Sequence, residues 1–210
     1  YSRPFMVIQG GKKIMQVCIL DVGMGNPQSV YRMFEELDAN AKVISTPSEF
    51  DVALDNVILV IPGVGTWDKG IELLEGLGWV EFIQNNLGHF RLLLGICLGM
   101  QLFFKSSDEG NKQGLGILDG HVGRLQNSKS INIGWREVRF VKDLGFSDSR
   151  FYHVHRFSVC RVGQPHIRGL EENGAVVCVE KDNILGFQFH PEKSHYYGKL
   201  LFKEILEKYA

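Results

Sequence analysis

The sequence predicts an α/β fold, a three-layer sandwich in which helices cover both faces of a mostly parallel central sheet with antiparallel additions. Short apolar runs alternate with helical segments through the first half of the chain, a pattern typical of parallel sheets. From Leu118 onward strand signals and aromatic residues dominate, which favours added antiparallel strands. No repeat or linker divides the 210 residues, so residues 15–210 are expected to form one domain.

The first half of the chain supplies four apolar runs and the helical patterns that separate them. Runs that predict buried strands cover residues 16–20, 42–44, 57–61 and 91–96. Between the first two runs, residues 29–37 read as a helix with Ser29 as its N-cap. The helical periodicity of residues 71–86 contains Gly76 and Gly78, which predict two short helices in place of one long one.

The second half predicts further strands and a closing helix. The strand-like segments are residues 138–141, 151–154, 175–179 and 184–189, and an amphipathic helix covers residues 195–209. Residues 1–14 fit this alternation poorly, because Pro4, Gly10 and Gly11 interrupt them before Met15. We expect residues 1–14 to be a leader that is not part of the domain, or else a short extra strand.

The composition excludes several classes of protein. The formal net charge of −1 offers no attraction for nucleic acid or an anionic membrane, and no apolar run approaches the ~20 residues of a membrane helix. The segment Gly23-Met24-Gly25-Asn26 lacks the third glycine of a dinucleotide-binding turn, so we expect no nucleotide cofactor. The four cysteines form no C-x-x-C pair, which favours a reducing, cytoplasmic setting.

The segment Gly95-Ile96-Cys97-Leu98-Gly99 carries the strongest chemical signal. It ends an apolar strand and precedes a helix-like stretch that runs to Phe104. Glycines two positions either side of Cys97 let strand and helix backbones approach closely, as in the G-x-S-x-G nucleophile elbow. The amide groups at the start of the helix would stabilise a thiolate there. Cys97 is therefore a candidate nucleophile.

His190-Pro191-Glu192 follows another predicted strand and completes a possible triad. His190 could share the proton of a thiol, and Glu192 could orient the imidazole. A buried cysteine in a glycine-flanked turn and an unrelated histidine would explain either motif alone. Together, however, the two motifs favour a cysteine nucleophile with its base and orienting acid.

Two further patterns lie near these motifs. Pro62-Gly63-Val64-Gly65 follows a buried strand, and the Gly63–Val64 peptide with the Leu98 amide could bind an oxyanion. An ordinary tight turn is the alternative. His153 and His155 share one face of a strand and could bind metal, but no third ligand has compatible spacing. We therefore expect a polar sheet face near the site and no metal.

Taken together, these residues resemble the class I (triad) glutamine amidotransferases, which have a flavodoxin-like three-layer fold. The resemblance runs from about Met15 to the C-terminus. It rests above all on the run Gly-Phe-Gln-Phe-His-Pro-Glu-Lys-Ser at residues 186–194 and on Gly-Ile-Cys-Leu-Gly-Met-Gln at residues 95–101. Within the family, the glutaminase subunits that serve a cyclase in histidine biosynthesis are the most similar.

The resemblance implies roles for individual residues. Cys97 would attack the side-chain amide of L-glutamine, His190 would protonate the departing ammonia, and Glu192 would orient His190. Gly63, Val64 and Leu98 would form the oxyanion site, while Gly65, Gln101 and Glu109 would hold the glutamine backbone groups. Asn26, Trp135, Tyr152 and Lys193 match positions at the interface with a (β/α)₈ cyclase, which would form a heterodimer with this chain and receive the ammonia.

Two segments depart from the family pattern and leave the pathway open. Residues 131–136 read Ile-Asn-Ile-Gly-Trp-Arg where the family has Pro-His-Met-Gly-Trp-Asn, and Arg156-Phe157 replaces Ser/Thr-Tyr. Arg136 and Arg156 would suit a different partner, such as the synthetase of a surface-sugar pathway. A stand-alone cysteine hydrolase or peptidase and a non-catalytic regulatory subunit are further alternatives, but the complete triad disfavours both.

Overall fold

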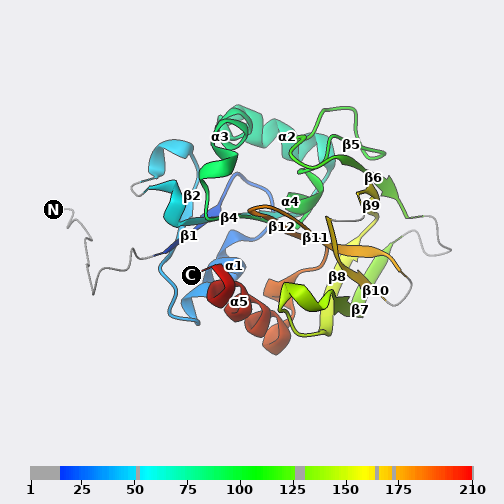
Figure 1. Cartoon of the computed structure of the whole chain (residues 1–210). Helices are drawn as coiled ribbons and strands as arrows, with labels where there is room; N and C mark the ends of the chain where they lie inside the picture. Colours follow the sequence, from blue (N-terminus) through cyan, green and yellow to red (C-terminus); the bar gives the residue numbers. More distant parts are fainter. Residues whose placement is uncertain (1–14, 51–52, 126–130, 164–165, 172–173, 210) are drawn as a thin grey trace.

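The structure, a computed structural model, describes residues 15–50, 53–125, 131–163, 166–171 and 174–209. The expected leader, residues 1–14, lies outside this part of the chain. A nine-stranded sheet with the order β2-β1-β3-β4-β12-β11-β10-β7-β8 forms the centre of the molecule (Figure 1). A small sheet with the order β5-β6-β9 lies beside it. Its strands are β5 (Ser106–Ser107), β6 (Gly120–Arg124) and β9 (Phe157–Val162).

The large sheet has a parallel half and an antiparallel half. The parallel strands are β2 (Ala41–Ile44), β1 (Gln16–Leu20), β3 (Val57–Gly63), β4 (Leu92–Cys97) and β12 (Ile184–Phe187). The antiparallel additions are β11 (Val176–Lys181), β10 (Ile167–Glu171), β7 (Asn132–Phe140) and β8 (Ser149–His155). This arrangement confirms the predicted mostly parallel sheet with antiparallel additions.

Helices cover both faces of the sheet, as predicted. One face carries α1 (Pro27–Glu35) and α5 (His195–Tyr209), and the other carries α2 (Trp67–Gly76), α3 (Trp79–Asn86) and the short α4 (Leu98–Gln101) (Figure 1). Short 3-10 turns are η1 (Pro47–Glu49), η2 (Leu54–Asn56), η3 (Leu87–His89), η4 (Lys142–Leu144) and η6 (Pro191–Lys193). None of the described helices has the length and apolar character needed to cross a membrane.

The alternation of side chains along the buried strands divides the interior into two cores. In β3, Ile58 and Val60 face the core under α1 and α5, while Leu59 and Ile61 face the core under α2, α3 and α4. All four side chains are fully buried, so β3 reads as one continuous apolar run. Helices cover both faces of the sheet, so we expect the functional site at the ends of the strands, where polar loops lie.

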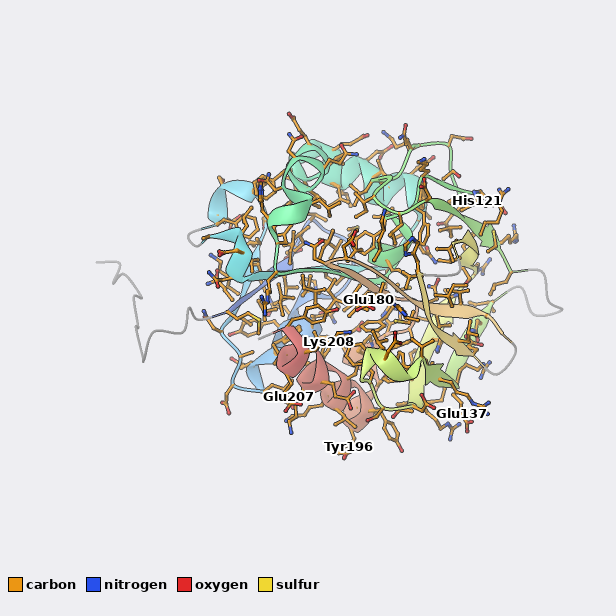
Figure 2. The ribbon with its side chains drawn as sticks, viewed as in Figure 1. His121, Glu137, Glu180, Tyr196, Glu207 and Lys208 are labelled. Carbon is orange, nitrogen blue, oxygen red and sulfur yellow. The ribbon has the colours of Figure 1, made fainter. Side chains whose placement is uncertain are left out.

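The last helix is fastened to the sheet by a charged contact as well as by apolar packing. Lys208 Nζ lies 2.9 Å from Glu180 Oε1 on β11, and the Tyr209 hydroxyl donates to the same oxygen at 3.0 Å. Figure 2 shows Glu180 and Lys208 close together where α5 meets the sheet. This contact fixes the end of α5, whose first residue follows the predicted catalytic segment.

The predicted elements are present, but β7 begins at Asn132 in place of the predicted residue 138, and strands β5, β6, β9 and β10 were not predicted. The break between the two helices falls at Gly78, whose φ of 77° favours glycine. The helix after Cys97 ends at Gln101, well short of the expected Phe104. The N-cap of α1 is Asn26, whose Oδ1 accepts the Ser29 N–H at 3.1 Å, so the prediction of Ser29 as the cap was wrong. Pro27 sets the earlier start, because its fixed φ suits the first helical position.

Candidate active site

Cys97 lies at the junction of β4 and α4 in a backbone conformation that few residues adopt. Its φ of 53° and ψ of −110° are unusual for a non-glycine residue, as in a nucleophile elbow. A Cβ on Gly95 would lie 2.6 Å from the Met100 backbone nitrogen, and one on Gly99 would overlap the Ile61 carbonyl oxygen. The two glycines therefore allow the close strand–helix packing that the sequence predicts.

His190 and Glu192 form a buried pair directly after β12. The distance from His190 Nδ1 to Glu192 Oε1 is 2.7 Å, and the two side chains are 1% and 5% exposed. Burial alone would lower the pKa of His190, but the Cys97 thiol and the Glu192 carboxylate outweigh it and raise the pKa to about 9. An imidazolium beside a thiol favours the thiolate, which is the nucleophilic form of cysteine.

The antiparallel half of the sheet curls back to hold this pair in place. Tyr152, on the edge strand β8, accepts the His190 N–H through its carbonyl at 2.8 Å. Ser194 Oγ accepts the Tyr152 N–H at 2.9 Å and donates to the His190 carbonyl at 2.6 Å. His190 is thus fixed through its backbone by a strand that is distant in the sheet order.

A pocket of about 420 Å³ opens beside Cys97, within the range of small-molecule sites. It is lined by Val64, Gly65, Cys97, Leu98, Gln101, Glu109, Ile131, Val154, His155, Arg156, Phe157 and Lys193. A larger hollow of about 530 Å³ lies between the start of β1 and α5, but no cysteine or histidine lines it. The pocket beside Cys97 is therefore the candidate site.

The residues expected to bind glutamine meet in this pocket. Gln101 is 5% exposed, and its Nε2 donates to the Phe157 carbonyl at 2.8 Å and to Gln188 Oε1 at 3.0 Å. Glu109 accepts the Trp67 N–H at 2.9 Å. Burial raises the pKa of Glu109, an effect that the Trp67 hydrogen bond opposes. Gly65 has a φ of 129°, which explains why a glycine stands there.

The residues expected to form the oxyanion site also lie together. Gly63 is paired with Cys97 across β3 and β4, and a Cβ on Gly63 would lie 2.7 Å from the Gly99 nitrogen. Val64 is 44% exposed and Leu98 is buried, and both line the pocket. The structure thus places the predicted residues beside the nucleophile.

Other pocket residues were missed or only partly identified from the sequence. Gln188 is fully buried and its Nε2 lies 3.7 Å from Cys97 Sγ, yet no role was predicted for it. Its position two residues before His190, directly after β12, was the available signal. Val154 and His155 enter from β8, and the Val154 carbonyl lies 4.0 Å from Cys97 Sγ. Ile131, Arg156 and Phe157, which depart from the family pattern, also line the pocket.

Of the residues expected at a partner interface, Lys193 lies at the pocket and Tyr152 is bridged to His190. Trp135 and Tyr152 are paired across β7 and β8, with ring centroids 6.2 Å apart. Lys193 follows Glu192 and lines the pocket directly. Asn26 lies in the loop of Gly25, where an added Cβ would meet the Gly63 nitrogen at 3.2 Å.

Comparison with known proteins agrees with this geometry. The family model described as glutamine amidotransferase class-I matches residues 18–208. The chain belongs to the class I glutamine amidotransferase family. It is 37% identical over 206 residues to the imidazole glycerol phosphate synthase subunit HisH of Aquifex aeolicus, covering 92% of this chain and 99% of that protein. It is 35% identical over 203 residues to the subunit HisH 2 of Methanococcus maripaludis, covering 91% and 99%.

Solved structures at less than 20% identity share the fold of this chain. A crystal structure described as a glutamine amidotransferase matches with a TM-score of 0.76 at 19% identity, covering 92% of this chain and 98% of that one. A chain of the PurLQS structure from Thermotoga maritima matches with a TM-score of 0.72 at 17% identity, covering 94% and 100%. The chain is therefore a glutamine amidotransferase with the class I fold.

Proposed function

We infer that this amidotransferase hydrolyses L-glutamine to L-glutamate and ammonia with Cys97, His190 and Glu192 as its triad. The observation that carries the proposal is the strained elbow of Cys97 beside the 2.7 Å pair of His190 and Glu192. The adjoining pocket of about 420 Å³ has a carboxylate and a buried amide on its walls. No group outside the chain is needed for the chemistry, so we propose no cofactor.

The reaction would proceed in two halves. The Cys97 thiolate attacks the side-chain carbonyl carbon of glutamine, and the amides of the Gly63–Val64 peptide and Leu98 stabilise the oxyanion. The carbon–nitrogen bond then breaks, and the proton held on His190 goes to the departing ammonia, leaving a glutamyl thioester. Neutral His190 next takes a proton from water, which attacks the thioester and releases glutamate and the thiolate. Glu192 keeps the His190 ring oriented in both halves.

The substrate would be held by its backbone groups at the other end of the pocket. Glu109 offers a carboxylate for the α-ammonium group, and the main chain at Gly65 offers an unshielded amide for the α-carboxylate. Gln101 is held by two hydrogen bonds, so it presents a fixed amide to the substrate. Together these contacts would place the side-chain amide of glutamine at Cys97.

The ammonia would pass to a (β/α)₈ cyclase that forms a heterodimer with this chain. The cyclase would use it to make imidazole glycerol phosphate and AICAR in cytoplasmic histidine biosynthesis. The names of the relatives support this pathway, since they are subunits of imidazole glycerol phosphate synthase. Asn26, Trp135, Tyr152 and Lys193 would meet the cyclase. The exposed side chains of Val64 and Ile133, at 44% and 53%, give the same region apolar surface.

A second candidate keeps the glutaminase and changes the partner. Arg156 lines the pocket, and Arg136 lies on β7 with its guanidinium bonded to the Trp135 and Ile133 carbonyls. These two arginines replace uncharged family residues near the expected interface. They favour a partner of different surface charge, such as a synthetase that aminates a surface sugar.

Glutamate release measured with and without candidate partners tests the proposal. We expect slow release by the chain alone and strong stimulation by a histidine-pathway cyclase carrying its nucleotide substrate. Hydrolysis that the cyclase leaves unchanged would contradict the histidine pathway and favour the sugar pathway. No hydrolysis of glutamine with either partner would contradict the glutaminase itself.

A further inference from the structure

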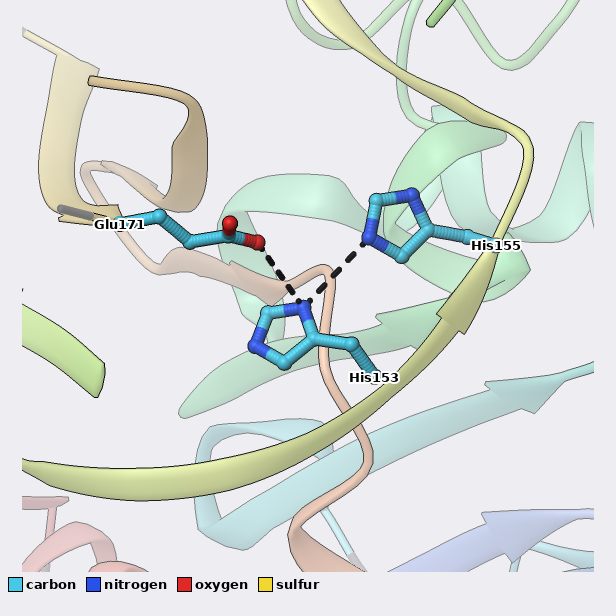
Figure 3. Close-up of side chains that lie close together, drawn as sticks. All are labelled: His153, His155 and Glu171. Atoms are coloured by element: carbon cyan, nitrogen blue, oxygen red, sulfur yellow. Dashed lines mark hydrogen bonds and ion pairs between the residues drawn. The ribbon is translucent and has the colours of Figure 1, made fainter. Parts of the chain in front are cut away.

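A second group of chemically active side chains lies beside the glutaminase pocket. His153 and His155 on β8 are 0% and 8% exposed, and Glu171 at the end of β10 is 5% exposed. Figure 3 shows the two imidazole rings and the carboxylate turned toward one another. In the part of the chain that the structure describes, this is the one group of three histidine, cysteine or acidic side chains placed to share a metal ion.

The sequence offers no third ligand with compatible spacing, but the structure places Glu171 beside His153 and His155. Glu171 is 16 residues from His155 in the chain and lies on a strand that is not a neighbour of β8 in the sheet order. Only the curled antiparallel half of the sheet brings it to the histidines. Spacing along the sequence therefore could not identify it.

The distances within the group match the edges of a metal tetrahedron. His153 Nδ1 lies 3.4 Å from His155 Nε2 and 3.3 Å from Glu171 Oε1. Ligand atoms about 2.0–2.1 Å from a tetrahedral Zn²⁺ are themselves about 3.3 Å apart. The third separation, between His155 Nε2 and the Glu171 carboxylate, is within 4.8 Å. The Asn132 amide lies beside the group, with its nitrogen 3.2 Å from His155 Nε2 and 2.8 Å from Glu171 Oε1. The two histidine nitrogens and the carboxylate are therefore close enough to share one ion.

The second nitrogen of His155 is held as it is in metal-binding histidines. His155 Nδ1 lies 3.0 Å from the Phe157 carbonyl oxygen, which can only accept a hydrogen bond. The proton of a neutral His155 ring is therefore on Nδ1, and the lone pair of Nε2 points into the group. Metal-bound histidines are oriented by such a bond from their other nitrogen to a carbonyl or carboxylate.

We propose that His153 Nδ1, His155 Nε2 and the Glu171 carboxylate bind a single Zn²⁺ ion. A water molecule or the Asn132 side-chain oxygen completes the tetrahedron. Two imidazoles and a carboxylate suit zinc better than the oxygen-seeking Mg²⁺ or Ca²⁺. His155 also lines the glutaminase pocket, which gives the ion a path from solvent.

The bound ion stabilises the wall of the glutaminase pocket that contains His155. It ties the end of β8 to the end of β10 and fixes the His155 ring. The Phe157 carbonyl bonds both His155 and Gln101, so the same ion steadies the Gln101 amide. The role is structural, because a separate group, Cys97 with His190 and Glu192, contains the nucleophile.

Zinc binding by the purified full-length chain tests this proposal. The Cys97→Ala variant serves as the parent protein, because the Cys97 thiol could itself bind zinc. After removal of metals, Zn²⁺ is titrated against a coloured chelator, and Co²⁺ is added in a parallel sample to record its visible absorption. His153→Phe and Glu171→Gln are made in the same background. The matched control is His121→Gln, which removes a histidine that pairs with Asp108 at the surface, as Figure 2 locates it.

We expect the parent and the His121→Gln control to bind one zinc ion per chain and to give the intense spectrum of tetrahedral cobalt. His153→Phe and Glu171→Gln should each weaken zinc binding by at least about 100-fold, beyond the 10–100-fold cost of losing an outer-shell partner. Failure of the folded parent to bind zinc would overturn the proposal, as would equal binding by all variants. If a variant fails to fold, the stoichiometry and cobalt spectrum of the parent decide. The result does not depend on glutaminase activity.

Discussion

Two buried histidine–glutamate pairs lie among the described residues, and they differ in spacing, contact distance and the direction of the histidine pKa shift. His190 and Glu192 are two residues apart in the chain and 2.7 Å apart in space. His153 and Glu171 are on separate strands, and their contact is longer, at 3.3 Å. Thiol and carboxylate raise the pKa of His190 to about 9. Burial, together with His155 and Arg136, lowers the pKa of His153 to about 3.

The difference shows that a carboxylate neighbour does not by itself set the charge of a buried histidine. His190 has a short bond to Glu192 and a thiol beside it, and these outweigh the cost of burying the charged ring. The longer contact between His153 and Glu171 does not offset burial and the nearby positive groups. The first pair is suited to moving a proton, and the second to presenting neutral nitrogen lone pairs.

The largest expected effect comes from the same substitution made in each pair. Glu192→Gln should lower kcat for glutamine hydrolysis on the order of 10²- to 10⁴-fold, because His190 loses its orienting carboxylate. Glu171→Gln should leave kcat within about threefold of the parent, since Glu171 does not contact the reacting atoms. Steady-state glutamate release, measured with the stimulating partner present, checks both values. Equal losses of kcat in the two variants would contradict the different roles of the two pairs in glutamine hydrolysis.

A second expected effect is a loss of stability at alkaline pH that the first pair alone produces, because the lowered pKa of His153 affects stability only below about pH 6.5. The folded pKa of His190, about 9, exceeds the ~6.5 of an unfolded histidine, so the folded state binds the proton more tightly. This stabilisation is fully present below about pH 6.5 and is lost as the pH rises through about 9. Its upper limit is about 3.5 kcal/mol, since each pKa unit is worth about 1.4 kcal/mol.

Urea unfolding at about pH 6 and about pH 9.5 measures this loss. The Glu192→Gln variant is the control, because without the carboxylate the pKa of His190 should fall and the pH dependence should shrink. A parent whose free energy of unfolding changes with pH no more than that of Glu192→Gln would contradict the assignment of the raised pKa to this pair.

The smallest expected effect concerns the second pair without metal. Glu171→Gln should lower the free energy of unfolding by about 1–3 kcal/mol, because the buried contacts to His153 and Asn132 lose their charge. Glu137→Gln is the matched control on the exposed side of β7, visible at the rim of Figure 2, and should change stability by less than about 0.5 kcal/mol. Denaturant unfolding in chelator-treated buffer compares them. If Glu171→Gln leaves the free energy of unfolding unchanged, the contacts of this carboxylate with His153 and Asn132 do not stabilise the fold.

The same contrast explains how much could be predicted from the sequence. The parallel half of the sheet followed from apolar runs and glycine positions, which act locally on the backbone. Cys97, His190 and Glu192 were found because Cys97 ends β4, and His190 and Glu192 follow β12 within five residues and are two residues apart in the chain. The residues of β8 reach the site through the Tyr152–His190 contact, which depends on the curling of distant strands. For that reason Glu171 was missed, although it is buried and polar. Gln188 was missed although it lies only two residues before His190, because its contact with Cys97 appears only in the folded chain.

The most direct test of the central claim, that Cys97 is the nucleophile of a glutaminase, is to map where an electrophilic glutamine analogue such as a chloroketone attaches. Cys97 is 6% exposed in a pocket, whereas Cys160 is an exposed free thiol that any unspecific reagent would reach first. We expect one adduct, on Cys97, that forms more slowly when L-glutamine is in excess. Labelling of Cys160 instead, or labelling of Cys97 that glutamine does not slow, would contradict it.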